Sequence, residues 1–172
     1  MNIIKILAAI TIICSSTLLG VSKAKKLSDR EYILREFITF LTIVKNEIKY
    51  MLTVLPNAYE IARMSLKTEL KDSIGMIATE MVSNKDSISI QKSIEENINK
   101  ISQLNGYDKA VIVNILKNLG STNKDGQINL IDNAIKQIEN QINEAVDIKI
   151  KNSRIYRTIG TLFGIAVVVI FI

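Results

Sequence analysis

The fold is decided by residues 125–172, which read DGQINLIDNAIKQIENQINEAVDIKIKNSRIYRTIGTLFGIAVVVIFI. The first half carries apolar residues at spacings of three and four, the period of one face of a coiled-coil-like helix. They are Ile128, Ile131, Ile135, Ile138, Ile142 and Ala145. Polar residues lie between them, namely Asn133, Lys136, Gln137, Glu139, Asn140 and Gln141. From Thr158 to Ile172 no charged residue occurs. We therefore predict one helix that leaves a soluble bundle and enters a membrane.

A second apolar stretch runs for 17 residues from Ile6 to Ser22. Lysines flank it, at position 5 on one side and at positions 23, 25 and 26 on the other. A secretory signal peptide would share this short basic start, with residues 22–24 as a poor cleavage site. A lipoprotein signal would use Cys14, but the bulky Ile12 and Ile13 before it do not suit such a signal. The basic flank on the C-terminal side favours an uncleaved membrane anchor.

Basic collars next to both apolar ends predict the topology. They consist of Lys23, Lys25, Lys26 and Arg30, and of Lys149, Lys151, Arg154 and Arg157. Both collars lie in the middle segment, which by the positive-inside rule faces the cytoplasm, with both termini on the far side. We expect an N-terminal transmembrane helix in residues 1–24, a cytoplasmic helical bundle in residues 25–154 and a C-terminal transmembrane helix in residues 155–172. Each span is short for a bilayer, which needs about 20 residues, unless the helices begin near Ile3 and Ile155.

Small residues recur four apart in both predicted spans. They are Ser16, Gly20 and Ala24 in the first, and Gly160 and Gly164 in the second. Such spacing lets two helix backbones approach closely in lipid, so these residues are candidates for transmembrane packing. Glycine is also common in membrane helices in general, and the sequence leaves both interpretations open.

The first soluble helix is expected from Ser28 to Leu52, with Ser28 and Glu31 as a capping box. Its apolar stripe continues the spacing of three and four. The stripe comprises Leu34, Phe37, Leu41, Val44, Ile48 and Met51, widened by Ile38 and Leu52. We expect this helix to pair, antiparallel, with the helix that begins at Asp125.

Four shorter helices are expected between these two. Pro56 suits the first turn of a helix that reaches Met64, and a second spans Leu66 to Val82. A third carries apolar residues from Ile90 to Leu104 and is closed by Asn105 and Gly106. Asp108 can cap the fourth, which Gly120 closes. Residues 84–87 and 121–126 are loops, and no stretch alternates like a strand. The soluble part is thus an all-α bundle of about six helices.

The composition argues against most enzyme classes. The chain has no histidine, one cysteine and no glycine-rich phosphate loop, so the usual triads, most zinc sites and a P-loop ATPase are excluded. Residues 123–127 resemble a calcium loop but lack its ligand spacing, and a turn with a helix cap is the better interpretation. The carboxylate pairs Glu95–Glu96 and Asp29–Glu31 are interpreted as solvated helix surface. We expect no catalytic residue, no cofactor and no metal.

Two features allow more than one interpretation. Glu47 lies beside the apolar stripe, either as a buried hydrogen-bonding residue at a helix junction or as an exposed ion pair with a nearby lysine. The basic collars suit acidic lipid headgroups, whereas nucleic-acid binding would need a basic face with interleaved aromatic residues. The collars lie where the two apolar ends begin, which favours lipid.

The chain resembles the stage III sporulation protein AB family. The N-terminal likeness comprises Leu19, Gly20, Ala24, Leu27, Arg30, Leu34, Arg35, Leu41, Glu47, Ile48, Tyr50 and Leu55-Pro56-Asn57-Ala58. The C-terminal likeness comprises Leu119, Gly120, Asp125, Gln127, Tyr156, Arg157, Gly160 and Gly164. Taken together, the resemblance covers the whole length of the chain, although residues 66–107 contribute little to it. The chain departs from the family in Thr53-Val54, where a proline-containing step is common.

The resemblance implies a non-enzymatic membrane scaffold of the channel complex that connects mother cell and forespore. It places the protein in the outer forespore membrane, with a bundle similar to the cytoplasmic domain of the type II secretion F protein. The implied partners are a secretion-type ATPase, other membrane subunits of the channel and membrane lipid, but no nucleic acid, and a homo-oligomer is compatible. The residues marked for partner contact are Arg30, Arg35, Glu47, Tyr50, Pro56, Tyr156 and Arg157, each of which also has a structural explanation. The alternative is a membrane-anchored helical module that binds another protein or a polyanion.

Overall fold

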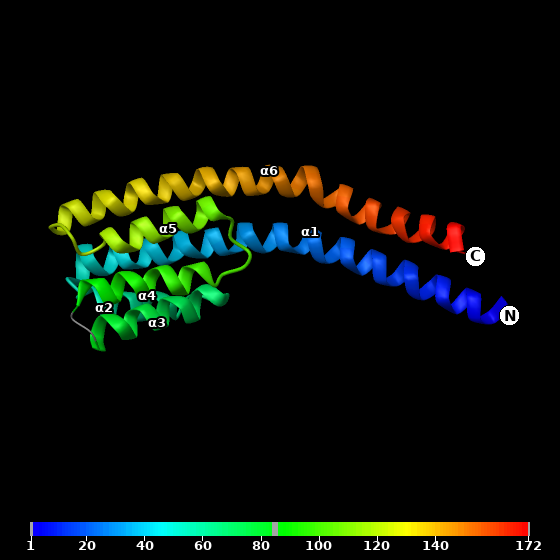
Figure 1. Ribbon diagram of the computed structural model, residues 1–172. Coiled ribbons are helices and arrows are strands. Elements are labelled where there is room, and N and C mark those ends of the chain that lie inside the picture. Colours follow the sequence, from blue (N-terminus) through cyan, green and yellow to red (C-terminus); the bar gives the residue numbers. More distant parts are fainter. Residues whose placement is uncertain (1, 84–85, 172) are drawn as a thin grey trace. The chain divides into compact units, whose positions relative to one another are not determined.

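The computed structural model describes residues 2–83 and 86–171. Within its helices, the side chains of residues 2–10, 12–13, 19–20, 23–24, 153–154, 156–157, 160–161, 163–165 and 167–171 lie outside the description. The described residues contain helices and no strand (Figure 1), which confirms the predicted all-α class.

The helices follow one another through short connections. In chain order they are α1 (Asn2–Asn46), the π-helical turn η1 (Glu47–Met51), α2 (Leu55–Arg63), α3 (Glu69–Ser83), α4 (Ser87–Asn99), α5 (Gly106–Asn118) and α6 (Lys124–Phe171). The chain divides into two compact units. Unit 1 comprises residues 1–31 and 144–172, and unit 2 comprises residues 32–143.

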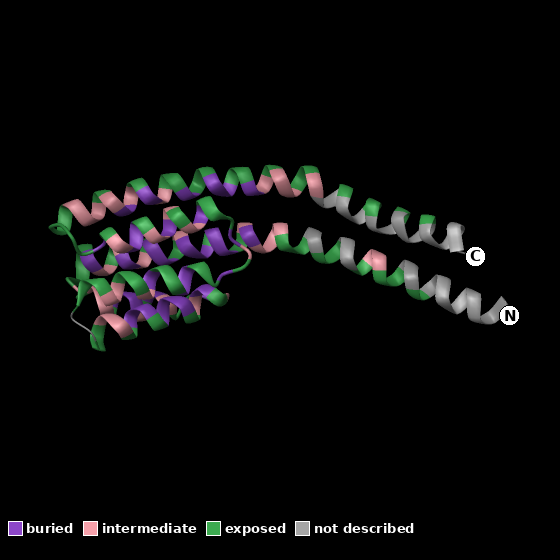
Figure 2. Ribbon diagram, viewed as in Figure 1, coloured by how far each residue is buried: buried purple, intermediate pink, exposed green. Residues whose placement is uncertain are grey.

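The core of unit 2 is built on the apolar stripe of α1 (Figure 2). Leu34, Phe37, Leu41 and Val44 are fully buried, as the periodicity predicts. The ring of Phe40 stacks on Phe37 at 5.8 Å and meets Tyr59 of α2 edge-on at 4.9 Å between centroids. The hydroxyl of Tyr59 has no hydrogen-bond partner among the described residues, and burial raises the pKa of this phenol.

The last helix buries the predicted seam. Ile131, Ile138, Ile142 and Ala145 are buried, whereas Ile128 and Ile135 are half-buried. Ala134 is buried with them. Gln141, which the sequence assigns to the polar side, is also buried, so the stripe is wider than predicted.

Within unit 2, α1 and α6 run antiparallel, which confirms the predicted pairing (Figure 1). Lys45 Nζ lies 2.5 Å from Asp132 Oδ1. Further back along α1, Arg35 and Ile38 share a surface hollow with Glu139 and Ile142, which are further along α6. Residue numbers thus decrease along α1, from 45 to 35, while they increase along α6, from 132 to 139, so the two helices run in opposite directions.

In unit 1, acidic residues pair with the predicted collars. Arg30 is 7% exposed and its guanidinium lies 3.6 Å from the Glu144 carboxylate. The Lys149 ammonium donates to Glu31 at 2.9 Å. Part of the basic charge beside the apolar ends is therefore balanced within the protein.

Two predictions about α1 are wrong. Ser28 and Glu31 do not start a helix, because α1 is continuous from Asn2 and no proline or glycine interrupts residues 21–31. Met51 and Leu52 do not continue the buried stripe but are 69% and 72% exposed. The helix widens into η1 at Glu47, so the spacing of three and four no longer holds there.

The boundaries around α4 and α5 also differ from the prediction. Helix α4 ends at Asn99, yet Ile101 and Leu104 are buried in the connection that follows. Asn105, and not Asp108, caps α5: its Oδ1 accepts from the Asp108 amide at 2.7 Å, and Asp108 accepts from the Asn105 amide in return. Asp108 is thus the second member of a capping box.

The turn predicted at Gly120 is confirmed, whereas α6 begins at Lys124, inside the loop predicted for residues 121–126. Gly120 follows α5 with φ 87°, the left-handed conformation that favours glycine. The Gly126 amide donates to Asn123 Oδ1 at 2.9 Å, so Asn123 caps α6, which confirms the helix cap predicted in residues 123–127. Pro56 lies in the first turn of α2, as predicted.

One buried polar contact was not predicted. Glu36 of α1 is 7% exposed, and its carboxylate accepts from the Lys67 amide at 2.8 Å and the Thr68 amide at 3.1 Å. It also accepts from the Thr68 hydroxyl at 2.6 Å. These groups lie just before α3, so a side chain of α1 completes the N-terminus of another helix.

The described residues include no helix segment that is long and apolar enough to span a bilayer. Most residues of the predicted spans 1–24 and 155–172 have side chains outside the description. The two membrane helices therefore stay a prediction.

Replacing Glu36 by alanine is expected to lower the free energy of unfolding by about 2–4 kcal/mol, since three donors lose their acceptor in a buried place. Glu36→Gln keeps an acceptor oxygen and should cost about half as much. Urea unfolding of the full chain in mild detergent, followed by circular dichroism, measures both. The matched control is Glu96→Ala on the exposed face of α4, expected to change stability by less than about 0.5 kcal/mol. Equal effects of Glu36→Ala and Glu96→Ala would contradict the capping role.

Candidate docking surface

The turn after α1 holds an unusual backbone. Glu47–Met51 forms the π-helical turn η1, and Leu52 follows in the left-handed region with φ 54° and ψ 30°. Among the residues that the structure describes, Leu52 is the one non-glycine residue with a positive φ. A leucine in this conformation costs about 1–2 kcal/mol, which neighbouring contacts must offset.

Glu47 supplies those contacts. Its carbonyl accepts from the Leu52 amide and, at 3.1 Å, from the Thr53 amide. Its carboxylate accepts from the Thr53 hydroxyl at 2.7 Å. Of the two interpretations of Glu47, the structure therefore supports the hydrogen-bonding residue at a helix junction, half-buried rather than fully buried.

This turn presents four large apolar side chains to solvent. Tyr50, Met51, Leu52 and Val54 are 64%, 69%, 72% and 63% exposed. We call these four residues the knob. The ammonium of Lys49 lies 5.0 Å from the centroid of the Tyr50 ring, and Lys124 of α6 donates to the Lys49 carbonyl at 3.3 Å. The knob is thus apolar with two lysines beside it.

A cleft of about 390 Å³ begins directly after the knob, in the same unit. Its apolar lining consists of Leu55, Pro56, Met81, Ile90, Ile94, Leu116 and Leu119. Its polar lining consists of Ser87, Gln91, Lys117 and Ser121, with Gly120 between Leu119 and Ser121. The lining comes from the starts of α2 and α4 and the ends of α3 and α5, which meet at one end of unit 2 (Figure 1).

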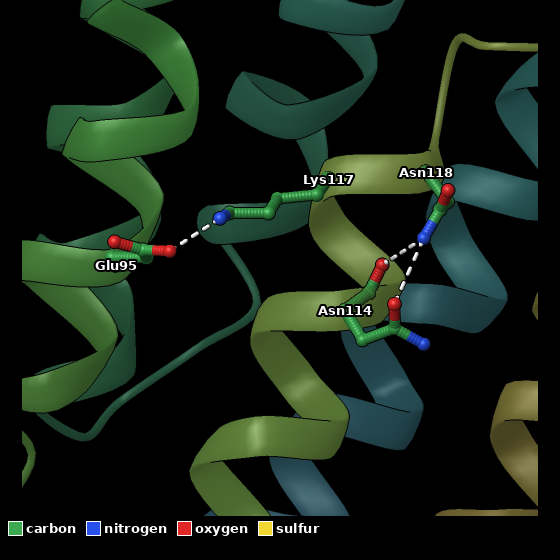
Figure 3. A network of polar contacts seen from close by, with 4 residues as sticks. All are labelled: Glu95, Asn114, Lys117 and Asn118. Atoms are coloured by element: carbon green, nitrogen blue, oxygen red, sulfur yellow. Dashed lines mark hydrogen bonds and ion pairs between the residues drawn. The ribbon is translucent and has the colours of Figure 1, made fainter. Parts of the chain in front are cut away.

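One of the residues that line the cleft, Lys117, belongs to a network of polar contacts (Figure 3). The Lys117 ammonium of α5 reaches across to the Glu95 carboxylate of α4 in a close ion pair. The next residue of α5, Asn118, donates its side-chain amide to the Asn114 carbonyl at 2.7 Å and to the Asn114 side-chain oxygen at 3.0 Å, and neither of these two residues lines the cleft. The positive charge of Lys117 is therefore balanced by Glu95, and most of the remaining lining residues are apolar.

The structure brings together three of the residues marked for partner contact. Glu47 supports the turn, Tyr50 belongs to the knob and Pro56 lines the cleft. Arg35 is exposed on α1 beside the hollow shared with Glu139, and Arg30 lies buried in unit 1.

The remaining marked residues fall mostly beyond the described side chains. The side chains of Tyr156 and Arg157 lie outside the description, as do those of the packing candidates Gly20, Ala24, Gly160 and Gly164. Ser16 is described and half-buried. Contact and packing roles at these positions stay predictions.

Sequence reasoning missed most of this surface. The periodicity places Met51 and Leu52 in the buried stripe, whereas both are exposed, and the cleft unites residues that are far apart in the chain. One local signal was present, because residues 50–55 read YMLTVL directly before Pro56. A run so apolar next to a helix start cannot all face one core, so part of it must be exposed.

The molecule is an all-α bundle protein with a shaped apolar end, and among its described residues no three potential metal ligands gather. The family model of stage III sporulation protein AB matches residues 5–172. The chain belongs to that family, which is one of sporulation proteins and not a known family of enzymes. No curated protein and no solved structure matches this chain.

Removing the Thr53 hydroxyl is expected to loosen the turn. Thr53→Val should lower the free energy of unfolding by about 0.5–1.5 kcal/mol, because the Glu47 carboxylate loses its donor. Thr53→Ser keeps the hydroxyl and should stay close to the parent. The matched control is Thr42→Val, whose exposed hydroxyl bonds only to the carbonyl of Ile38 in its own helix. Chemical unfolding of the four proteins checks this, and no difference between Thr53→Val and Thr42→Val would refute the contribution of Glu47.

Proposed function

We propose that this protein is a non-enzymatic membrane scaffold in the channel complex between mother cell and forespore, and that it docks a secretion-type ATPase. The observation that carries the proposal is the family match over residues 5–172, which makes the chain a sporulation protein. The helical bundle of unit 2 is compatible with a scaffold, because the knob and the cleft together form an apolar surface at one end of this unit.

The proposed location follows from the charge pattern. The two apolar ends would anchor the chain in the outer forespore membrane, with the bundle in the mother-cell cytoplasm and both termini on the far side. Lys25, Lys26 and Lys151 are exposed and are available to acidic lipid headgroups. Other membrane subunits of the channel would meet the anchors, where the small residues of both spans allow close packing.

A reporter fused after Lys124 tests the topology. A fluorescent protein at this position should be active and alkaline phosphatase inactive, because the bundle is expected on the cytoplasmic side. Fusions after Ile172 should give the reverse result. Active phosphatase after Lys124 would overturn the proposed orientation and the ATPase partner with it.

Binding of a purified secretion-type ATPase to the full chain in detergent tests the docking role. Wild type should retain the ATPase, and Arg35→Glu should weaken binding several-fold if the exposed Arg35 lies in the contact. Lys136→Glu, an equal charge change at an exposed position of α6, serves as the control. Retention of a polyanion instead, lost at moderate salt, would favour the alternative of a binding module.

A further inference from the structure

The knob carries two energetic costs in one short segment. Its four apolar side chains are 63–72% exposed, although each would gain free energy by leaving water. Leu52 also holds a left-handed backbone that glycine adopts without steric penalty. Backbone strain and apolar exposure coincide at Leu52, and together with the exposed apolar neighbours in the knob they point to a surface shaped for contact.

The cleft beside the knob has the complementary shape. It is a hollow whose walls are mostly apolar, and two further exposed apolar residues adjoin lining residues in the sequence, Val82 at 68% and Ile88 at 74%. The knob does not fill the cleft of its own chain, because all its side chains project into solvent. The knob and the cleft therefore lie next to each other at one end of unit 2, and both are accessible to solvent.

We propose that the knob of one copy of this chain seats in the cleft of a second copy, and the reverse, in a twofold pair. In such a pair one surface must be complementary to itself, so that each copy offers what the other lacks. A projection next to a hollow meets this condition, and a second copy covers both in a single contact. This pairing goes beyond the scaffold role proposed above.

The charges at this end fit the same arrangement. Lys49 and Lys124 lie beside the knob. Asp86, the exposed N-cap of α4, directly precedes the lining residue Ser87 in the chain. Lys117 in the cleft wall is already neutralised by Glu95. When a knob enters the cleft of the other copy, its lysines approach Asp86 of that copy, and opposite charges meet.

Cross-linking between two differently tagged full-length chains tests the geometry. Both chains carry Cys14→Ser, one with Leu52→Cys in the knob and the other with Gln91→Cys in the cleft. Mixed in detergent and oxidised, they should form a disulfide that joins the two tags. The matched control replaces Gln91→Cys by Met76→Cys, which is exposed on α3 and does not line the cleft, and it should not cross-link to Leu52→Cys.

Leu52→Gly separates folding from association. Glycine relieves the left-handed strain, so this variant should unfold at no lower temperature than wild type. Its self-association constant, measured by sedimentation equilibrium of the full chain, should fall roughly tenfold or more because a leucine side chain no longer enters the cleft. Retained stability with lost association is the expected result.

Three outcomes would overturn the proposal. Wild type could be monomeric throughout the micromolar range, or Leu52→Gly could associate as tightly as wild type, which would move the contact to another surface. The Leu52→Cys chain could also cross-link as well to Met76→Cys as to Gln91→Cys. If wild type is monomeric and Leu52→Gly loses an added secretion-type ATPase, the surface belongs to that partner and the second copy is excluded.

Discussion

Burial of one face of α1 is the constraint on which unit 2 depends. Leu34, Phe37, Leu41 and Val44 are fully buried, and each such side chain contributes about 1.5–3 kcal/mol when removed from water. The same helix carries Glu36, whose buried carboxylate completes the start of α3. The helix therefore supplies both the apolar core and a polar contact that orients a neighbouring element.

The buried face of α1 is no longer continued beyond Glu47 and Ile48, and the exposed knob and the cleft follow in the chain. The π-helical turn breaks the helical period, so the next apolar residues turn away from the core. Glu47 binds Thr53 through its carbonyl and its carboxylate, and these bonds hold Leu52 in a strained conformation. A junction that ends the buried stripe thus also shapes the exposed knob, next to the cleft that starts at Leu55.

The helices themselves were largely predictable, because apolar residues at spacings of three and four report which face is buried. This worked for the α1 stripe up to Ile48 and for the α6 seam. It failed where other effects decide the boundary. Ser28 has the residues of a capping box but lies inside a continuous helix, and Ile101 and Leu104 are buried without being helical. Capping motifs and apolar residues show which helix boundary or burial a segment permits, and contacts with neighbouring segments decide which of these the fold adopts.

Periodicity and local motifs carried by neighbouring residues determined the all-α class and the turn at Gly120. The apolar ends next to the two long helices predicted the antiparallel pairing of α1 and α6, and the family was predicted from its resemblance to residues along the whole chain. Tertiary structure alone decided the partners of Glu36 and the cleft between the ends of four helices. It also decided the exposure of Met51 and Leu52. The physical reason is separation along the chain. The hydrogen bond that the Thr68 amide donates to Glu36 joins residues 32 positions apart, and no local pattern encodes which distant donor a carboxylate will meet.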